Sequence, residues 1–342
     1  MQSRAVMFCC GAAAGLVGAV GLCKTRPQLF QQQAVDDHHQ DEDANNNLFM
    51  YGYPEPHISA HSYTDHSLTY DRSKKIPVWV AECINKDMVT SRLAKRARSE
   101  FQPDPKLPQE YCSSNTDYRG SGWSRGHMAP AGNYKHCQNS MDDTFLLTNI
   151  VPQNLDNNSG YWNSVEDYCR RLSKRYTQVS VISGPLFLPQ RDTEGEKSFV
   201  KYEVIGENNV AVPTHLFKII LAEDRPDSPP LLGAFVVPNE PIKDVSLTQF
   251  QVSLEEVEKH TGTRFHCKLD RSQVSDLCAV DGCKINSQKD WAIMGYKKRV
   301  QAAASSQELE KVWGEVKDKG VHHDKPLSDL YSQKKAKFAS SS

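Results

Sequence analysis

The sequence predicts an α+β fold, with a central, mainly antiparallel sheet flanked by helices and a helical C-terminal extension. Three observations carry this prediction. Apolar residues between positions 179 and 237 alternate or form short runs, which is the pattern of strands. Apolar stripes with helical spacing occur on both sides of that region. The tail from residue 284 has no strand pattern. We therefore divide the chain into residues 1–47, 48–283 and 284–342.

The N-terminal 47 residues read as a leader followed by a linker. Residues 1–35 contain three basic residues and no acidic one, and residues 8–23 are an uncharged run of 16. That run is shorter than the ~20 residues needed to span a bilayer. We expect a mitochondrial leader, which becomes an inner-membrane anchor if it is retained, and a secretory signal peptide is the alternative. Residues 31–47 are polar without apolar periodicity, so the folded body should begin near Leu48.

The first half of the body shows one strand and one helix in its pattern. Residues 77–81 read as a strand, and residues 86–98 as a charged helix or loop. Residues 103–108 carry three prolines and are expected to be irregular. Residues 164–176 read as a helix. Glu166 lies beside the apolar stripe of that helix, so its carboxylate can point elsewhere.

The second half of the body is expected to contain four strands, followed by further helices. The strands are residues 179–186, 200–205, 210–221 and 231–237. Ser253 and Glu256 form a capping box that starts a helix. Ser305 and Glu308 form a second box for a helix over residues 305–320. The apolar stripe of that second helix should dock on the body or on a second subunit.

Charge is nearly balanced overall but uneven along the chain. The formal net charge is −1, so bulk charge gives no sign of a polyanionic partner. Residues 72–98, however, hold eight basic and two acidic residues, and residues 284–342 hold 12 basic and 7 acidic ones. Either tract could face a phosphate backbone or be a solvated helix face. A hydrophobic content of 38% suits an ordinary globular protein.

Ten cysteines and a group of histidines invite a metal interpretation that their spacing does not favour. Seven cysteines lie beyond the leader, an odd number at irregular spacing, so we expect free, mostly buried thiols in a reducing compartment. The alternative is a structural zinc site with four ligands: His266, Cys267, Cys278 and Cys283. Three histidines also fall within ten residues: His57, His61 and His66. They have no acidic partner arranged around them, so we expect structural or surface roles.

Residues 123–166 crowd together groups that can act on a phosphodiester. His127 can move a proton near neutral pH, which makes it a candidate general base. Asn158 offers a neutral oxygen to a hard cation, and Glu166 can accept hydrogen bonds from water bound to that cation. Mg²⁺ usually keeps several waters, so a sparse ligand set is typical of its phosphoryl-transfer sites. A lone structural histidine and simple N-capping by Asn157 and Asn158 are the competing interpretations.

The same stretch resembles a known family. The sequence Ser-Arg-Gly-His at 124–127 resembles the Asp-Arg-Gly-His signature of the DNA/RNA non-specific nucleases, which have a ββα-metal (His-Me) finger. Residues 149–153 (Asn-Ile-Val-Pro-Gln), Asn158, Trp162 and Glu166 match the following block in order and spacing. The likeness extends from about Tyr63 to Cys283 and is greatest to the endonuclease G branch. It implies a ββα-metal finger inserted at one side of the sheet.

The resemblance implies a role for each matching residue. His127 is the general base that activates the attacking water, and Asn158 is the direct ligand of Mg²⁺ or Mn²⁺. Glu166 orients the waters of that cation, and Asn149 fixes the region around His127. Cleavage of DNA and RNA would leave a 5′ phosphate and a 3′ hydroxyl.

Three further residues are assigned to the substrate by the resemblance. Arg96 matches the family's upstream phosphate-binding arginine, whose fork suits the charge of the transition state. Arg125 supports the same site. Ser124 stands where most members have Asp, which removes a negative charge near the nucleic-acid strand and is similar to the exonuclease-like branch. The expectation is a 5′–3′ exonuclease bias with some endonuclease activity, serving mitochondrial DNA maintenance.

The resemblance also bears on assembly and leaves two competing functions. We expect a homodimer in the mitochondrial inner membrane or intermembrane space, and an extension, residues 284–342, that narrows the cleft and favours chain ends. One competing function is a nucleic-acid-binding protein with a degenerate site, for which Ser124 is the positive sign. The other is a small-molecule phosphodiesterase, which the basic tracts disfavour because a small substrate needs no extended positive surface.

Overall fold

The computed structural model describes residues 51–52, 60–192, 195–224 and 228–340 of the 342-residue chain. The predictions for the leader, the linker, the start of the body near Leu48 and His57 lie outside the described residues. Among the described residues, no helix combines the length and the apolarity required to cross a bilayer.

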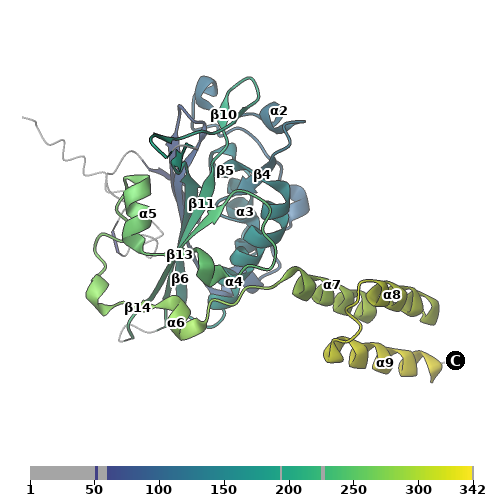
Figure 1. The fold of residues 1–342 in the computed structure, drawn as a ribbon. Helices are drawn as coiled ribbons and strands as arrows, with labels where there is room; N and C mark the ends of the chain where they lie inside the picture. Colours follow the sequence, from purple (N-terminus) through teal and green to yellow (C-terminus); the bar gives the residue numbers. More distant parts are fainter. Residues whose placement is uncertain (1–50, 53–59, 193–194, 225–227, 341–342) are drawn as a thin grey trace, which may run out of the picture. The chain divides into compact units, whose positions relative to one another are not determined.

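A central sheet organises the body (Figure 1). Its strands are, in spatial order, β1 (His61–Ser62), β2 (His66–Asp71), β3 (Ile76–Ile84), β6 (Gln178–Leu186), β11 (His215–Glu223), β12 (Leu231–Pro238) and β13 (Gln251–Val252). All neighbours in this order are antiparallel, and only β14 (Ser275–Asp276) pairs in parallel, with β12. The predicted α+β class with a mainly antiparallel sheet is confirmed.

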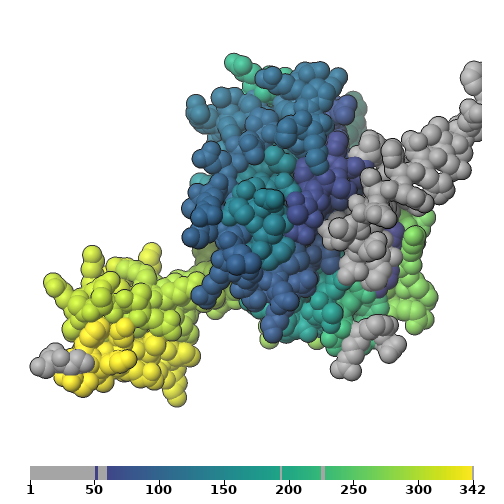
Figure 2. Space-filling model, turned by 180° about the vertical axis from the view of Figure 1, so that it is seen from behind, coloured from purple at the N-terminus to yellow at the C-terminus, as the bar shows by residue number. Residues whose placement is uncertain are grey.

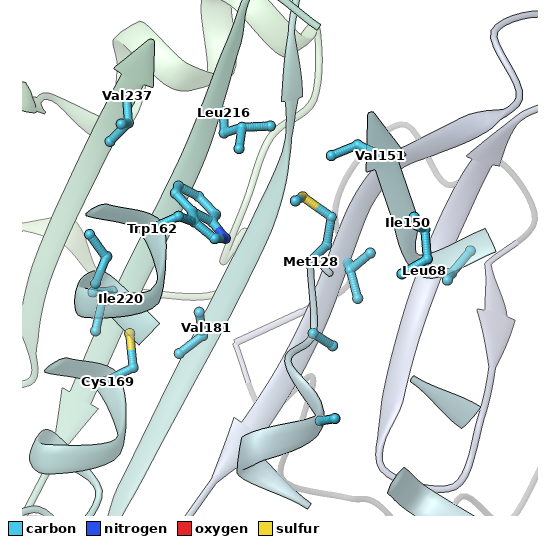
Figure 3. Close-up of a cluster of buried hydrophobic side chains, with 14 of the residues drawn as sticks. Leu68, Met128, Ile150, Val151, Trp162, Cys169, Val181, Leu216, Ile220 and Val237 are labelled. Carbon is cyan, nitrogen blue, oxygen red and sulfur yellow. The ribbon is translucent and has the colours of Figure 1, made fainter. Parts of the chain in front are cut away.

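The sheet buries both faces, which explains the short apolar runs in its strands. On β6 and β11, neighbouring residues enter different cores: Val181 and Ile220 face one, and Ile182 and Ile219 face the other. Helix α5 (Leu254–Thr261) covers the second core, whereas α4 (Asn163–Leu172) and the hairpin of β4 (Ser124–His127) and β5 (Ile150–Gln153) cover the first. Figure 3 shows Trp162 among the apolar side chains of the first core.

The remaining elements of the body are short. The helices are α1 (Lys86–Thr90), α2 (Asn115–Tyr118), α3 (Gln138–Asp143) and α6 (Leu277–Asp281). Two small strand pairs join β7 (Gln190–Arg191) to β8 (Ser198–Phe199) and β9 (Val204–Ile205) to β10 (Val210–Ala211). His66 is buried in β2, as expected of a structural histidine, and His61 is partly exposed at the end of the sheet.

Two strand predictions are wrong in extent. Residues 200–205 form a strand only at Val204–Ile205, and Val200 is half exposed, because this segment lies outside the central sheet. Residues 210–221 are two strands, not one, since Pro213 has no N–H to continue a ladder and β11 starts at His215.

The extension consists of α7 (Gln288–Ala302), α8 (Ser306–Asp318) and α9 (Lys325–Ala339). Ser305 caps α8 by accepting a hydrogen bond from the backbone N–H of Glu308, as predicted. The apolar stripe of α8 does not dock on the body. Its members pack with residues of α7 and α9 into a separate core, because three short helices can bury their stripes against one another. The buried residues of this core are Ile293, Val300, Ala303, Leu309, Val312, Val316, Val321 and Leu327. Figure 2 shows these helices packed together.

The expectation of free thiols is wrong for one pair. Cys278 and Cys283 form a disulfide. Helix α6 ends at Gly282, whose φ of 82° is a left-handed conformation that glycine adopts readily, and the turn brings the two Cα atoms to 4.8 Å. The pair removes two ligands of the alternative zinc site. Four other cysteines are free thiols, of which the first two are buried: Cys112, Cys169, Cys83 and Cys137.

Candidate active site

A cleft of about 610 Å³ lies over the β4–β5 hairpin and α4. Five of the seven predicted site residues line it: Arg96, Arg125, His127, Asn158 and Glu166. The other two do not line it: Ser124 bonds to Asn158, and Asn149 bonds to Ala129, two residues after His127. Residues from four separate segments are thus brought to one cavity.

The hairpin fixes the position of His127 at the end of β4. Its ladder pairs His127 with Ile150 and Gly126 with Val151. A side chain at position 126 would collide with Gln153, since a Cβ built there lies 2.1 Å from Gln153 Oε1. This close approach explains the glycine of the Ser-Arg-Gly-His sequence.

Asn149 forms hydrogen bonds with the backbone directly after His127. Its Oδ1 accepts from the Ala129 N–H at 2.9 Å, and its Nδ2 donates to the carbonyl oxygens of Ala129 and Thr144 at 2.9 and 2.8 Å. The backbone carbonyl of Asn149 also accepts from the Met128 N–H at 3.0 Å. Asn149 is fully buried. These bonds hold the segment that follows the histidine.

The surroundings of His127 favour a neutral imidazole. The ring is 7% exposed and lies 5.2 and 5.0 Å, centroid to centroid, from Phe101 and Phe145. Burial lowers the pKa of His127 to about 3, and the charges of Arg96 and Arg125 act in the same direction. Its Nε2 has no hydrogen-bond partner within the described part of the chain. A neutral nitrogen of this kind can accept a proton.

Asn158 is held by a π-helical turn, Asn157–Trp162, that precedes α4. The turn is anchored by buried amides: Gln153 Nε2 donates to Asn157 Oδ1 at 2.8 Å, and Asn157 Nδ2 donates to the carbonyl oxygens of Pro238 and Glu240. Insertions of π-helix often occur at functional sites. Trp162, at the end of the turn, is fully buried.

Ser124 contacts the amide of Asn158. Its hydroxyl donates to the Gln153 carbonyl oxygen at 2.8 Å and accepts from Asn158 Nδ2 at 3.0 Å. Because Nδ2 faces Ser124, the amide oxygen of Asn158 is directed away from that serine. This contact is a feature that the sequence pattern did not indicate.

Glu166 lies on α4 and is paired with a residue that the sequence analysis missed. Burial raises the pKa of Glu166, and the positive charges of Arg170, Lys218 and Arg96 oppose that rise. Arg170 Nη1 lies 3.9 Å from Glu166 Oε2 and also lines the cleft. Spacing of i and i+4 on a helix was a signal that could have found this arginine.

The two cleft arginines lie over aromatic rings. The guanidinium carbon of Arg125 is 4.2 Å from the ring centroid of Phe101, and that of Arg96 is 5.1 Å from that of Phe145. Arg125 also donates to Asn115 Oδ1 at 2.6 Å. The two rings that flank the histidine therefore also orient the two guanidinium groups. No local sequence signal linked these phenylalanines to the site.

The donor set suits a hard cation and an anionic substrate. It offers the amide oxygen of Asn158 and the carboxylate of Glu166, both oxygen ligands, beside two guanidinium groups. Within the described ranges, no cluster of three or more His, Cys, Asp or Glu side chains could hold a metal ion. The site therefore fits a cation that keeps most of its water and accepts few protein ligands.

Comparisons with known proteins agree with this geometry. Residues 44–272 match the family model of the DNA/RNA non-specific endonucleases. The chain is 44% identical to the mouse protein named Nuclease EXOG, mitochondrial, over 94% of this chain and 89% of that one. It is 44% identical to the human protein of that name, over 96% and 91% of the two chains.

A solved structure gives the same result. The chain resembles one in the crystal structure of the EndoG/EndoGI complex with a TM-score of 0.64 and 39% identity, over 67% of this chain and 94% of that one. The β4–β5 hairpin and α4 are the predicted ββα-metal finger. The chain belongs to the DNA/RNA non-specific endonuclease family and is a nuclease.

Proposed function

We propose that this nuclease hydrolyses phosphodiester bonds of DNA and RNA with Mg²⁺ as its cation, leaving 5′ phosphate and 3′ hydroxyl ends. The observation that carries the proposal is the buried His127, whose Nε2 has no described partner, in one cleft with Asn158, Glu166 and two arginines. Mn²⁺ has the same preference for oxygen ligands and is the alternative cation.

The amide oxygen of Asn158 would hold the cation, and Glu166 would accept hydrogen bonds from water in the cleft. When bound, Mg²⁺ supplies positive charge to the phosphoryl oxygens and to the leaving oxygen. His127 takes a proton from the attacking water at its uncharged imidazole nitrogen. Arg96 and Arg125 bind the phosphate, where their fixed positive charge is matched to the transition state.

Ser124 supports the proposed 5′–3′ exonuclease bias. A serine hydroxyl holds the Asn158 amide without adding the negative charge that Asp would bring to the cleft. A terminal phosphate carries more negative charge than an internal one, so the absence of a carboxylate removes more repulsion for it.

The start of the extension borders the cleft and supports an end preference. Trp291 lines the cleft, and its Nε1 donates to Ser164 Oγ on α4 at 2.7 Å. Asn286 Nδ2 donates to Asp167 Oδ2 at 2.9 Å. We propose that this segment narrows the path of the strand and favours chain ends. An unchanged ratio of terminal to internal cutting after deletion of residues 284–342 would refute this role.

The proposed setting is mitochondrial DNA maintenance, as a homodimer in the inner membrane or intermembrane space. The basis is the relatives' names, which include the word mitochondrial, and the basic leader. Membrane attachment would be through that leader.

The test is a time course on single-stranded DNA labelled at either end, with Mg²⁺ and with EDTA. We expect Mg²⁺-dependent release of short products from the 5′ end. Scattered internal cuts would support the proposed hydrolysis and contradict the exonuclease bias. Salt-sensitive binding without any product would favour a nucleic-acid-binding protein with a degenerate site.

A further inference from the structure

A buried lysine and a buried glutamate lie beneath the cleft, in the middle of the sheet. Lys218 on β11 is 1% exposed and Glu82 on β3 is 2% exposed. Both occupy the strand face that contributes Val80, Leu216 and Ile220 to the first core. Most of their neighbours on that face are apolar, so the strand pattern predicts neither charge.

Hydrogen bonds lead from this pair toward the cleft. Glu82 Oε2 accepts from Asn133 Nδ2 at 2.9 Å and from the Tyr134 hydroxyl at 2.8 Å. Asn133 Oδ1 in turn accepts from Arg170 Nη1 at 3.4 Å. The same Nη1 lies 3.9 Å from Glu166. A continuous series of polar contacts therefore joins the sheet interior to the carboxylate of the cleft.

The carboxylate of Glu82 determines which way the Asn133 amide faces. Glu82 Oε2 accepts from both the NH₂ group of Asn133 and the Tyr134 hydroxyl, so the NH₂ group of Asn133 points to Glu82. The amide oxygen then points to the guanidinium of Arg170. A neutral group at position 82 would accept or donate and would no longer fix this orientation.

Lys218 compensates the charge of Glu82. Burial raises the pKa of Glu82 to about 7, and the positive charge of Lys218 opposes that rise. Lys218 Nζ donates to Ser183 Oγ at 2.5 Å and lies 4.7 Å from the ring centroid of Trp162. Two buried opposite charges can often be replaced together by apolar residues of similar volume without loss of stability.

The backbone next to Asn133 also lies close to Arg170. A Cβ added at Gly132 would lie 3.1 Å from Arg170 Nη1, closer than most carbon contacts. The glycine gives the guanidinium room to reach Asn133. The local backbone and the buried pair thus specify the same position for this arginine.

We propose that Glu82 and Lys218 are positioning residues for nuclease activity, which act through Asn133 to fix Arg170 and thereby Glu166. The inference rests on the proposed function for its kinetic consequence, whereas its geometric consequence does not. It predicts that the pair is dispensable for folding and required for full turnover.

The test uses the full-length chain and three variants: Glu82→Gln, Lys218→Met and the double variant. Each single variant leaves one unpaired buried charge or polar group, so its melting temperature should fall. The double variant should regain most of that loss. Its kcat on single-stranded DNA at saturating Mg²⁺ should stay about 10- to 100-fold below the parent's, with KM for DNA little changed.

A second variant reaches Arg170 without touching the buried pair. Gly132→Ala should displace the guanidinium and reduce kcat in the same range, with little change in melting temperature. The control is Glu258→Gln, which removes the charge of a glutamate that binds Arg271 on the opposite side of the sheet. It should lower stability and leave kcat unchanged.

Crystal structures of the parent and the double variant separate this inference from the proposed function. We expect Arg170 to move away from Glu166 in the double variant whether or not the protein cuts DNA. An unmoved Arg170, or a stable double variant with the parent's kcat, would overturn the inference. A parent chain that cuts no DNA would refute the proposed function alone.

Discussion

The floor of the cleft and the C-terminal extension are held together by different forces. In the floor, Asn149, Gln153 and Asn157 are fully buried, and each makes hydrogen bonds to backbone or to another amide. In the extension, α7, α8 and α9 share a small apolar core. Its ion pairs, such as Arg299 with Glu315 at 2.5 Å, lie at the surface.

The difference assigns separate tasks to the two regions. Buried hydrogen bonds are directional, so they fix groups such as the backbone that follows His127 and the turn that carries Asn158. An apolar core with surface ion pairs maintains a shape but fixes few individual atoms. We therefore expect the body to supply the chemistry and the extension to control access to it.

Loss of the base should have the largest effect. His127→Ala removes the proton acceptor, so kcat should fall by about 10²- to 10⁴-fold, the usual contribution of a general base. DNA affinity, measured by fluorescence anisotropy in EDTA, should change little because both arginines remain. Full activity in this variant would end the proposed mechanism.

Loss of the extension's core should have a large effect on the structure of the extension and a selective effect on activity. Leu309 is fully buried in that core. Leu309→Ala should cost ~2–5 kcal/mol, which is comparable to the whole stability of so small a core. Hydrogen exchange should show loss of protection in α7–α9 while the strands of the body stay protected. Equal loss in β6 and β11 would show that the two regions unfold as one unit.

Two glycines provide a matched pair across the regions. Gly126→Ala should destabilise the body by ~1–3 kcal/mol through its collision with Gln153 and should also reduce activity. Gly314 lies in α8 with nothing within 4 Å of an added Cβ. Gly314→Ala should therefore stabilise that helix by ~0.5–1 kcal/mol. Thermal unfolding should show a lower melting temperature for Gly126→Ala and a higher one for Gly314→Ala.

The smallest effect is expected at the surface of the extension. Glu315 is paired with Arg299 at the surface, where the two side chains are 39% and 47% exposed and salt screens the interaction. Glu315→Gln should leave the melting temperature and the cleavage rate within experimental error. A clear loss of stability would mean that ion pairs, and not the apolar core, hold the extension.

The sequence was most informative where local chemistry decides the structure. Alternating apolar residues located β6, and Ser253 and Ser305 marked the starts of α5 and α8. The finger motif indicated four residues that line one cleft, and the family resemblance added Arg96. The remaining two, Ser124 and Asn149, bond to Asn158 and Ala129.

Contacts between distant segments were beyond the reach of sequence patterns. The ring contacts of Phe101 and Phe145 with His127 join segments that are distant in the sequence. The disulfide between Cys278 and Cys283 depends on the turn at Gly282 and not on the number of cysteines. Lys218 lies within a predicted strand, and only the fold shows that it and Glu82 are both buried on one face of the sheet.

The most direct test of the division between body and extension compares the parent chain with a chain lacking residues 284–342. The measurement is the ratio of terminal to internal cleavage on end-labelled single-stranded DNA, with His127→Ala in both chains as the control. We predict that the shortened chain still cuts in Mg²⁺ and that its ratio shifts toward internal cuts. An unchanged ratio would contradict the account, as would cleavage at the parent's rate without His127.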